Sequence, residues 1–326
     1  MCSFVRHILV FCALVGITSP PAWAFGRDGH ETTGAIAAKL ITGTHAEQEV
    51  AKILKPGEDL STAAIWADCA KGFMYCHKQP TAEMRDYAHK NPHHHGYHYA
   101  DIPFEEGAYK DNAVGANPED VVHVLTQAIS VLQGKTDPTH NPHGFTKREA
   151  LFLVAHLTGD IHQPLHVGAA YLDGNDEFVD PKSEDDLNSG KVAGTEGANW
   201  LMLGSHNLHS VWDTDLVHRA MRREHVTTPQ EFADALLVKG YPKPSDHGSP
   251  DTWPKKWADE SVKLAKTELE SVTPEERTEV EDKNGSHSVW SISLPRTYMP
   301  KGTIQFEKQL YLAGYRMAEV LKTVWP

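Results

Sequence analysis

The spacing of apolar residues along the chain predicts a mostly helical protein. Apolar positions recur every three to four residues in segments that begin after a capping residue or end before Gly or Pro. Strand-like alternation is weak, apart from a hairpin expected around residues 200–203, before Gly204. The expected helices cover residues 32–40, 45–54, 117–132, 147–161, 209–221, 228–238, 257–269 and 305–322. We therefore expect an all-α fold, built as a single compact domain with one small β-hairpin.

The first 24 residues have the features of a secretory signal peptide. Arg6 and His7 precede an apolar run over residues 8–16, and an A-x-A cleavage signal follows at residues 22–24. The run is too short to cross a bilayer, and no later segment reaches the roughly 18 apolar residues that crossing requires. We expect cleavage before Phe25, export to the periplasm or the medium, and a folded domain over residues 25–326.

Two later segments lack any period and are expected to be loops. Residues 168–197 are acidic and rich in Gly, and residues 242–254 are rich in Pro, Ser and Gly. A loop as long as the first is uncommon in a compact domain unless it is functional or mobile. We interpret residues 168–197 as an acidic loop or insertion.

The charge, histidine and cysteine content of the chain limit the kinds of site that it can form. Asp and Glu number 44 against 31 Lys and Arg, which gives a formal charge of −13. This acidity argues against a broad basic surface for polyanions, so phosphate chemistry needs a local source of positive charge. The 21 histidines point to metal as that source. After signal cleavage only Cys69 and Cys76 remain, which in an oxidising compartment favours a disulfide over two free thiols.

Residues 155–166 contain the clearest candidate metal ligands. His156 and Asp160 are four apart, so both project from one face of an apolar helix. A hydrogen bond between them inside a helical core explains an isolated pair equally well, because each buried group needs a partner. Here the pair is followed by His166, placed after the helix-ending Pro164, where the chain can turn a further imidazole toward the same pocket.

The same four-residue spacing recurs at His209 and Asp213, again in an apolar setting. Together with the first segment it supplies nitrogen and oxygen ligands of the type that zinc prefers. Asp68, which ends a W-A-D triplet, is a further candidate. Asp259 ends a second W-A-D triplet, but its charged neighbours indicate a solvated face.

Other histidines give weaker signals. His30 lies five residues after the expected new N-terminus, where the free amine and the carbonyl of Phe25 can form a chelating pair. Residues 93–95 and His98 are ambiguous, because a histidine tract in a loop usually binds only adventitious metal.

Taken together, these residues resemble the zinc-dependent single-strand-specific nuclease family, of the mung bean nuclease or type I nuclease/3′-nucleotidase type. The resemblance runs from Phe25 to the last helix, and it depends on the order of its motifs directly after a cleavage signal. The motifs are F-G-x-x-G-H at 25–30, W-A-D at 66–68, H-Y-A-D at 98–101, H-Q-P-L-H at 162–166, N-L-H-S-x-W-D at 207–213 and L-A-G-Y-R-M-A at 312–318.

The resemblance implies three zinc ions per chain in a helical fold whose hairpin lies near the active site. The implied ligands are Asp68, His98, His156 and Asp160 for one ion; Phe25 (amine and carbonyl) and His30, bridged by Asp160, for the second; and His166, His209 and Asp213 for the third. The implied activity is cleavage of single-stranded RNA, single-stranded DNA and 3′-nucleotides by a zinc-activated water, with 5′-phosphorylated products. A monomer without a stable protein partner is expected.

The resemblance also assigns catalytic contacts. Asp68 would orient the attacking water, and Lys71 would reach the phosphate oxygens at a position where the family more often has Arg. Because Lys lacks the bidentate fork of Arg, the implied activity is lower or differently selective.

Base recognition is assigned in the same way. Tyr99 would stack on an unpaired base beside Asp101, although packing and a turn also explain these two residues. The family's Gly-Gly-Asn motif matches residues ending at Asn199 by distance to His209, or at Asn175 by distance from His166. We favour Asn199.

Two other functions are compatible with these residues. A zinc-dependent phospholipase C has a similar fold and similar ligands, but Tyr99, Asp101 and a last ligand at Asp213 argue against it. A zinc-binding protein without turnover would leave Tyr99, Lys71 and the position of His30 unexplained.

Overall fold

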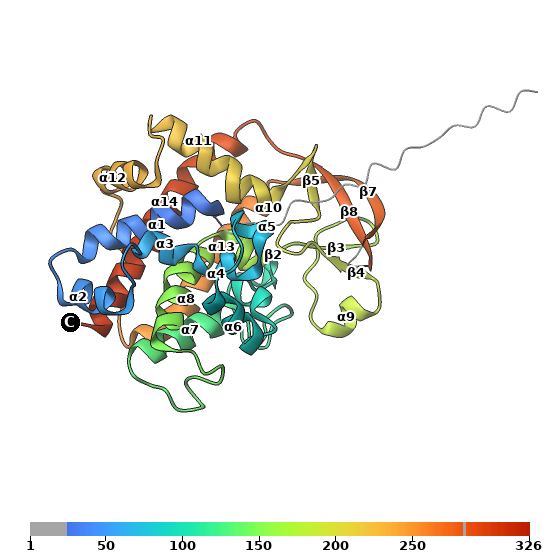
Figure 1. The fold of residues 1–326 in the computed structure, drawn as a ribbon. Helices are drawn as coiled ribbons and strands as arrows, with labels where there is room; N and C mark the ends of the chain where they lie inside the picture. Colours follow the sequence, from blue (N-terminus) through green and yellow to red (C-terminus); the bar gives the residue numbers. More distant parts are fainter. Residues whose placement is uncertain (1–24, 283–284) are drawn as a thin grey trace, which may run out of the picture.

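A body of packed helices carries a small sheet at one end (Figure 1). The computed structural model describes residues 25–282 and 285–326, so the predicted signal peptide lies outside the described residues. Helices dominate, which confirms the predicted all-α class. Among these residues, every helix falls short of the length and apolarity that a membrane span requires.

The helices of eight or more residues form the body. They are α1 (Gly26–Ile41), α2 (His45–Ile53), α6 (Ala82–Lys90), α7 (Val121–Leu132), α8 (Lys147–Asp160), α11 (Leu216–Arg223), α12 (Pro229–Lys239), α13 (Trp253–Leu269) and α14 (Tyr298–Val324). The short ones are α3 (Leu60–Ala64), α4 (Trp66–Lys71), α5 (Phe73–Cys76), α9 (Glu184–Asn188) and α10 (Leu208–Ser210).

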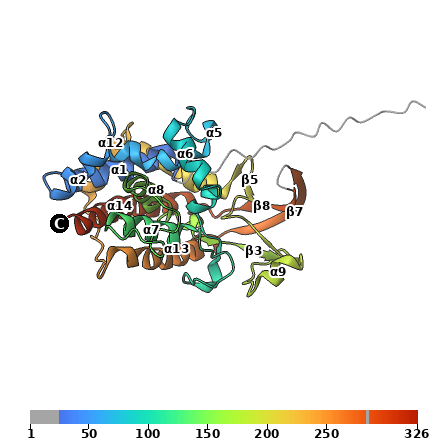
Figure 2. The same cartoon turned by 60° about the horizontal axis from the view of Figure 1, so that its bottom comes forward.

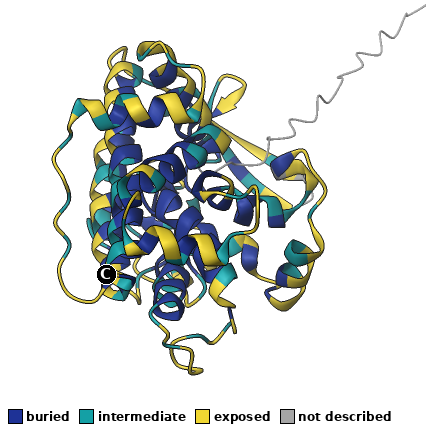
Figure 3. Cartoon of the chain, turned by 60° about the vertical axis from the view of Figure 1, so that its left-hand side comes forward, coloured by how far each residue is buried: buried dark blue, intermediate teal, exposed yellow. Residues whose placement is uncertain are grey.

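Helix α8 lies inside the body and carries two of the predicted metal ligands. It begins at a capping box formed by Thr146 and Glu149, and its residues from Glu149 to Asp160 are all buried. An apolar helix of this kind is stable only when other helices cover every face. Figure 3 shows the resulting buried interior beneath an exposed outer layer.

Glycines let the helices around α8 approach closely. An added Cβ at Gly34 of α1 would lie 2.3 Å from the carbonyl oxygen of Leu60, at the start of α3. One at Gly314 of α14 would lie 2.5 Å from the Cβ of Ile36. Helix α1 is therefore held in contact with both neighbours, which fixes the position of its first turn.

Five predicted helices have different boundaries in the structure. Three of them, α1, α13 and α14, begin four to seven residues before the predicted starts at residues 32, 257 and 305. The helix expected from Asn117 begins at Val121, because the side chain of Asp120 caps the backbone N–H groups of Val122 and His123. The helix expected over residues 209–221 is observed as α10, a π-helical turn at Val211–Asp215, and α11.

The strands are more numerous than predicted. The hairpin around Gly204 is present as β5 (Leu201–Leu203) and β6 (His206–Asn207). It belongs to a four-stranded sheet of order β6-β5-β8-β7, with β7 (Thr273–Asp282) and β8 (Gly285–Ser293) as a long hairpin. Figure 2 shows this sheet projecting from the helical body. In β8 every second residue is buried, at Ser288, Trp290 and Ile292.

The segment expected to be an acidic loop, residues 168–197, contains short regular elements. Strand β2 (Gly168–Ala169) pairs in parallel with β1 (Ile102–Pro103), and β3 (Tyr171–Asp173) pairs with β4 (Val192–Gly194). Helix α9 lies between β3 and β4. The chain is therefore locally ordered by pairing that its own periodicity does not reveal.

Candidate metal centre

Buried His and Asp side chains form three adjoining groups inside the helical body. In each group the candidate ligand atoms lie within 4.8 Å of one another. The groups are His30, His156 and Asp160; Asp68, His98 and His156; and His166, His209 and Asp213. Every side chain that the sequence suggested as a metal ligand is therefore brought into one of these groups.

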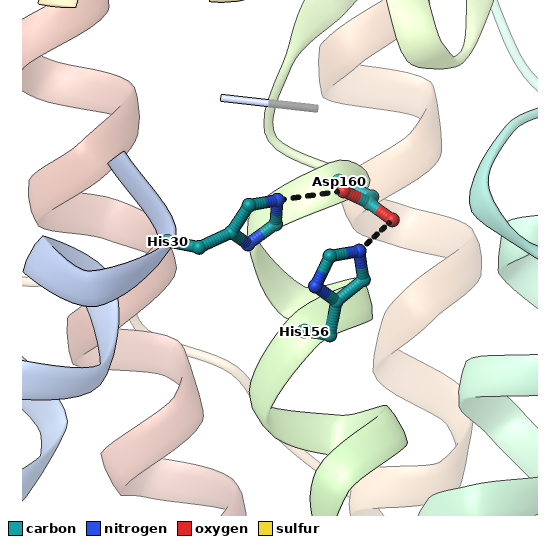
Figure 4. A group of neighbouring side chains, drawn as sticks. All are labelled: His30, His156 and Asp160. Carbon is teal, nitrogen blue, oxygen red and sulfur yellow. Dashed lines mark ion pairs between the residues drawn. The ribbon is translucent and has the colours of Figure 1, made fainter. Parts of the chain in front are cut away.

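The first group joins α1 to α8 (Figure 4). His156 and Asp160 project from successive turns of α8, and the first turn of α1 places His30 against them. The imidazoles of His30 and His156 stack with their centroids 3.9 Å apart. At Gly159 an added Cβ would lie 2.8 Å from Nδ1 of His30, so only glycine leaves room for this ring.

Asp160 links the first two groups. Its Oδ1 lies 3.2 Å from Nε2 of His30, and its Oδ2 lies 2.9 Å from Nδ1 of His98 and 3.1 Å from Nε2 of His156. Asp68 approaches from α4, with Oδ1 3.7 Å from the same atoms of His98 and His156. One fully buried carboxylate thus faces three imidazoles.

The third group adjoins them where the chain leaves α8. Nε2 of His209 lies 3.0 Å from Nε2 of His166 and 3.2 Å from Oδ2 of Asp213. The side-chain amide of Gln163 donates a 2.8 Å hydrogen bond to Oδ1 of Asp213. Sequence reasoning missed Gln163 as a positioning residue, although it stands inside the H-Q-P-L-H motif.

Backbone carbonyls orient three of the imidazoles. Nδ1 of His156 donates a hydrogen bond to the carbonyl oxygen of Ala64 at 2.6 Å. In the same way, Nδ1 of His166 donates to the carbonyl oxygen of His98 at 2.9 Å, and Nδ1 of His209 donates to the carbonyl oxygen of Gly197 at 2.7 Å. With the proton on Nδ1, each Nε2 is left as a lone pair that faces the cluster. This is the arrangement in which histidine binds a metal ion.

Several atoms at the centre have no hydrogen-bond partner within the described residues. They are Nε2 of His30, Oδ1 of Asp68, Oδ1 of Asp160 and Oδ2 of Asp213. Buried polar atoms are rarely left unpaired, because each such atom costs about 1–3 kcal/mol. Convergent carboxylate and imidazole lone pairs are the donor set of a divalent cation such as zinc, so the residues present fit that group.

The electrostatics keep three of these side chains in their metal-binding forms. Burial opposes ionisation of Asp160, but His156, His30 and His98 hold its pKa well below the usual range. Burial, with Lys71, lowers the pKa of His98 to about 3. Burial, with His209, lowers the pKa of His166 to about 4. Near neutral pH Asp160, His98 and His166 are therefore in the protonation state that binds a cation. Although burial opposes it, the neighbouring carboxylates raise the pKa values of His156 and His209, so cation binding competes with a proton at these two residues.

Phe25 and Gly26, the first residues that the structure describes, lie beside the three metal groups. Phe25 is fully buried with a φ of 43°, and its ring packs edge-on against Phe306 at 5.2 Å. An added Cβ at Gly26 would lie 2.6 Å from the carbonyl oxygen of Asp213. The backbone of residues 25 and 26 therefore lies between the third group and α14.

Lys71 lies on the other side, at Asp68. Its Nζ is 2.9 Å from Oδ1 of Asp68, and both side chains are 8% exposed. Lys71 lies within the short loop closed by a disulfide between Cys69 and Cys76, and this disulfide confirms the predicted bond. Lys71 is thus a nearly buried cation held at the edge of the metal groups.

Of the residues predicted for base recognition, Tyr99 lies at the surface, whereas Asp101 and Asn199 are partly buried. Tyr99 follows the buried His98 and is 43% exposed. Burial raises the pKa of Asp101 to about 6, although the backbone N–H of Gly197 donates to its carboxylate. Gly197 therefore links two residues of the site. Its backbone N–H faces Asp101, and its carbonyl oxygen accepts the hydrogen bond that orients His209.

The two candidate asparagines lie in different surroundings. The side-chain amide of Asn199 donates to the carbonyl oxygen of Glu196 at 2.7 Å and accepts a hydrogen bond from Nδ2 of Asn207 at 3.3 Å. Asn175 instead bonds to Asp173 in the exposed turn after β3. Asp259, set aside in the sequence, accepts the backbone N–H of Tyr109 at 2.8 Å and belongs to none of the three groups.

A helical body that buries three adjoining His/Asp groups, with a lysine at one carboxylate, has the candidate ligands of a multinuclear metal site. Comparison with known sequences is consistent with such a site and refines the assignment. A family model described as S1/P1 nuclease matches residues 25–325, and the chain belongs to the S1/P1 nuclease family. It is therefore a nuclease, a hydrolase of phosphodiester bonds in nucleic acid.

Named relatives extend the match over most of the chain. Nuclease S1 of Aspergillus oryzae is 25% identical over 325 residues, which cover 93% of this chain and 92% of that protein. Endonuclease 5 of Arabidopsis thaliana is 26% identical over 321 residues, covering 93% and 91%. Endonuclease 2 of the same plant is 25% identical over 233 residues, covering 71% and 69%.

Proposed function

We propose that this nuclease is a trinuclear-zinc endonuclease of single-stranded RNA and DNA with 3′-nucleotidase activity, and that its products are 5′-phosphorylated. The observation that carries the proposal is the set of three buried groups, each with at least one ligand atom that has no hydrogen-bond partner within the described residues, in a chain of the S1/P1 family. Residues 25–326 form the catalytic domain, which acts as an exported monomer.

The ligand sets follow the three groups. They are Asp68, His98, His156 and Asp160; His30 with the amine and carbonyl of Phe25, bridged by Asp160; and His166, His209 and Asp213. The buried position of Phe25, beside His30 and Asp213, supports its role, and so does the start of the family match at this residue. The amine becomes a ligand only after cleavage, because an amide nitrogen has no free lone pair.

Zinc in these groups supplies Lewis-acid activation of water and stabilisation of charge on the phosphate. Asp68 then acts as hydrogen-bond acceptor for the attacking water and fixes its direction. Although burial opposes ionisation, Lys71, His156 and His98 hold the pKa of Asp68 below its usual range, so it remains an acceptor. Lys71 donates to a non-bridging phosphate oxygen, and its near burial strengthens that contact.

Tyr99 and its neighbours select unpaired bases. The exposed ring of Tyr99 stacks on a nucleobase, and a base within a duplex offers no free face for that contact. Asp101 and Asn199 bind the edge of the same base, because the 197–199 segment joins them beside His209. Selectivity for single strands follows from this stacking requirement.

The test uses protein that begins at Phe25. We expect about three zinc ions per chain, and chelator-sensitive release of 5′-mononucleotides from single-stranded RNA and DNA. Lys71→Ala should lower kcat/KM by about a hundredfold, as loss of one charge-stabilising donor does, and Lys71→Arg should restore part of it. Asp259→Asn is the matched control and should leave both readouts unchanged. Phosphatidylcholine hydrolysis without nucleotide release, or zinc binding without turnover, would overturn the proposal.

A further inference from the structure

A groove outside the metal centre gathers arginines on a protein of formal charge −13. The groove lies between α11 and α14 and encloses a cavity of about 490 Å³. Its arginines occupy one face of α11 at i, i+3 and i+4 spacing, and all are exposed. The lining residues are Arg219, Arg222, Arg223, Pro300, Thr303 and Ile304.

Two of these guanidinium groups lack a protein partner. Within residues 25–282 and 285–326, the side chains of Arg219 and Arg222 make no hydrogen bond and no ion pair. Arg223 is shared between Glu224 and Glu307, each at 3.8 Å. Arg219 and Arg222 therefore lack the acidic partners that Arg223 has, and adjacent unpaired guanidinium groups attract an anion.

The groove is connected to the metal centre by one continuous run of helix. Helix α11 follows α10 and the π-helical turn, which carry His209 and Asp213 (Figure 1). At a rise of about 1.5 Å per residue, Arg219 lies roughly 9 Å and Arg222 roughly 14 Å beyond Asp213 along the axis. Asp213 is buried and the two arginines are exposed, so they project from different faces of the helix, and a strand that reached both sites would follow the protein surface.

The geometry points to a binding site for phosphodiester groups: we propose that Arg219 and Arg222 hold the backbone of the bound single strand outside the metal centre. This inference rests on the proposed function. Guanidinium forks match phosphate oxygens bidentately, and Ile304, 41% exposed, gives the sugar or base an apolar surface. The groove thus adds a local source of positive charge that the acidic composition otherwise lacks.

The test compares long and short ligands on the zinc-loaded enzyme. The variant is Arg219→Ala/Arg222→Ala, which leaves the Arg223 ion pairs intact. The control is Arg85→Ala/Lys263→Ala, which removes two exposed positive charges elsewhere. Fluorescence anisotropy gives the Kd of a labelled phosphorothioate 12-mer, which resists hydrolysis, and of a phosphorothioate dinucleotide, each over a range of salt.

We expect the groove variant to bind the 12-mer about tenfold more weakly at low salt, and its slope of log Kd against log salt to fall by about 1.4, since two phosphate contacts are lost. Dinucleotide binding and the control variant should change less than about twofold. Arg219→Lys/Arg222→Lys should retain the salt slope, which separates loss of charge from misfolding.

Three results would overturn the inference: unchanged 12-mer affinity, an equal loss for the dinucleotide, or an equal loss of 5′-AMP binding, which would assign the groove to free nucleotides. Failure of the proposed function is distinguishable, because a wild-type enzyme that releases no nucleotide still reports strand binding by anisotropy.

Discussion

Asp160→Asn tests whether one carboxylate serves two of the three metal groups. The substitution keeps the shape of the side chain but removes its charge, at a residue whose oxygens lie 2.9–3.2 Å from His30, His98 and His156. The third group makes no such contact with Asp160, so its zinc should remain. We therefore expect zinc content to fall from about three ions to about one, and kcat/KM to fall at least about a thousandfold, since a bridging ligand is lost.

The stability change follows from the number of groups. A site with free zinc at 100 times its Kd stabilises the folded state by about 2.7 kcal/mol, so three sites contribute about 8 kcal/mol and one contributes about 3 kcal/mol. The zinc-induced stabilisation should therefore shrink by about 5 kcal/mol. At about 2–3 °C per kcal/mol for a chain of this size, the zinc-induced rise in Tm should be some 10–15 °C smaller.

The assay measures zinc by atomic spectroscopy and Tm by calorimetry, with each protein compared to its own chelator-treated form. Asp213→Asn should lose only about one ion, and Asp259→Asn, whose carboxylate accepts the N–H of Tyr109, should lose none. Three zinc ions retained by Asp160→Asn, with an undiminished rise in Tm, would refute the bridging role.

Three further outcomes are expected. Residues left ahead of Phe25 turn its amine into an amide, so a tagged protein should bind about one zinc ion fewer and be nearly inactive; equal specific activity before and after tag removal would contradict this. Burial raises the pKa of Glu268 from 4.5 to about 7, so the folded state holds this proton more tightly and loses stability as pH rises through that window. Glu268→Gln should match the wild type near pH 4 and exceed it by roughly 3 kcal/mol above pH 7 in urea unfolding, whereas a pH-independent difference would argue against it. Cys69→Ser/Cys76→Ser should lose about 2.5 kcal/mol in the same assay, because a short closed loop is released, and no loss would show that the loop is ordered without the bond.

Periodicity predicted helices well where one element's own residues determine its structure. Helix α8 begins after the expected capping residue, Thr146, and its mostly apolar residues continue to a few residues before the helix-ending Pro164. The apolar periodicity predicted strands poorly. Strand β7, for example, is charged along most of its length, so it has no apolar pattern, and it is ordered by pairing with β8. The same reason explains the short strands within residues 168–197.

The amino-acid sequence by itself determined the ligand types and their local spacing. His156 with Asp160, and His209 with Asp213, face the same way because four residues make about one helical turn. The distance to His209 along the chain favoured Asn199 over Asn175, and the fold adds that the carbonyl oxygen of Gly197 accepts a hydrogen bond from Nδ1 of His209.

Tertiary structure alone decided that three separate stretches meet at Asp160. His30, Asp68 and His98 come from α1, α4 and the turn before β1, and no local period relates them. They converge because α8 is covered on every side and glycines allow its neighbours to approach closely. The carbonyl of Ala64 that orients His156, and the guanidinium groups left unpaired beside α14, likewise depend on which helices become neighbours, since local sequence specifies a helix but not its partner.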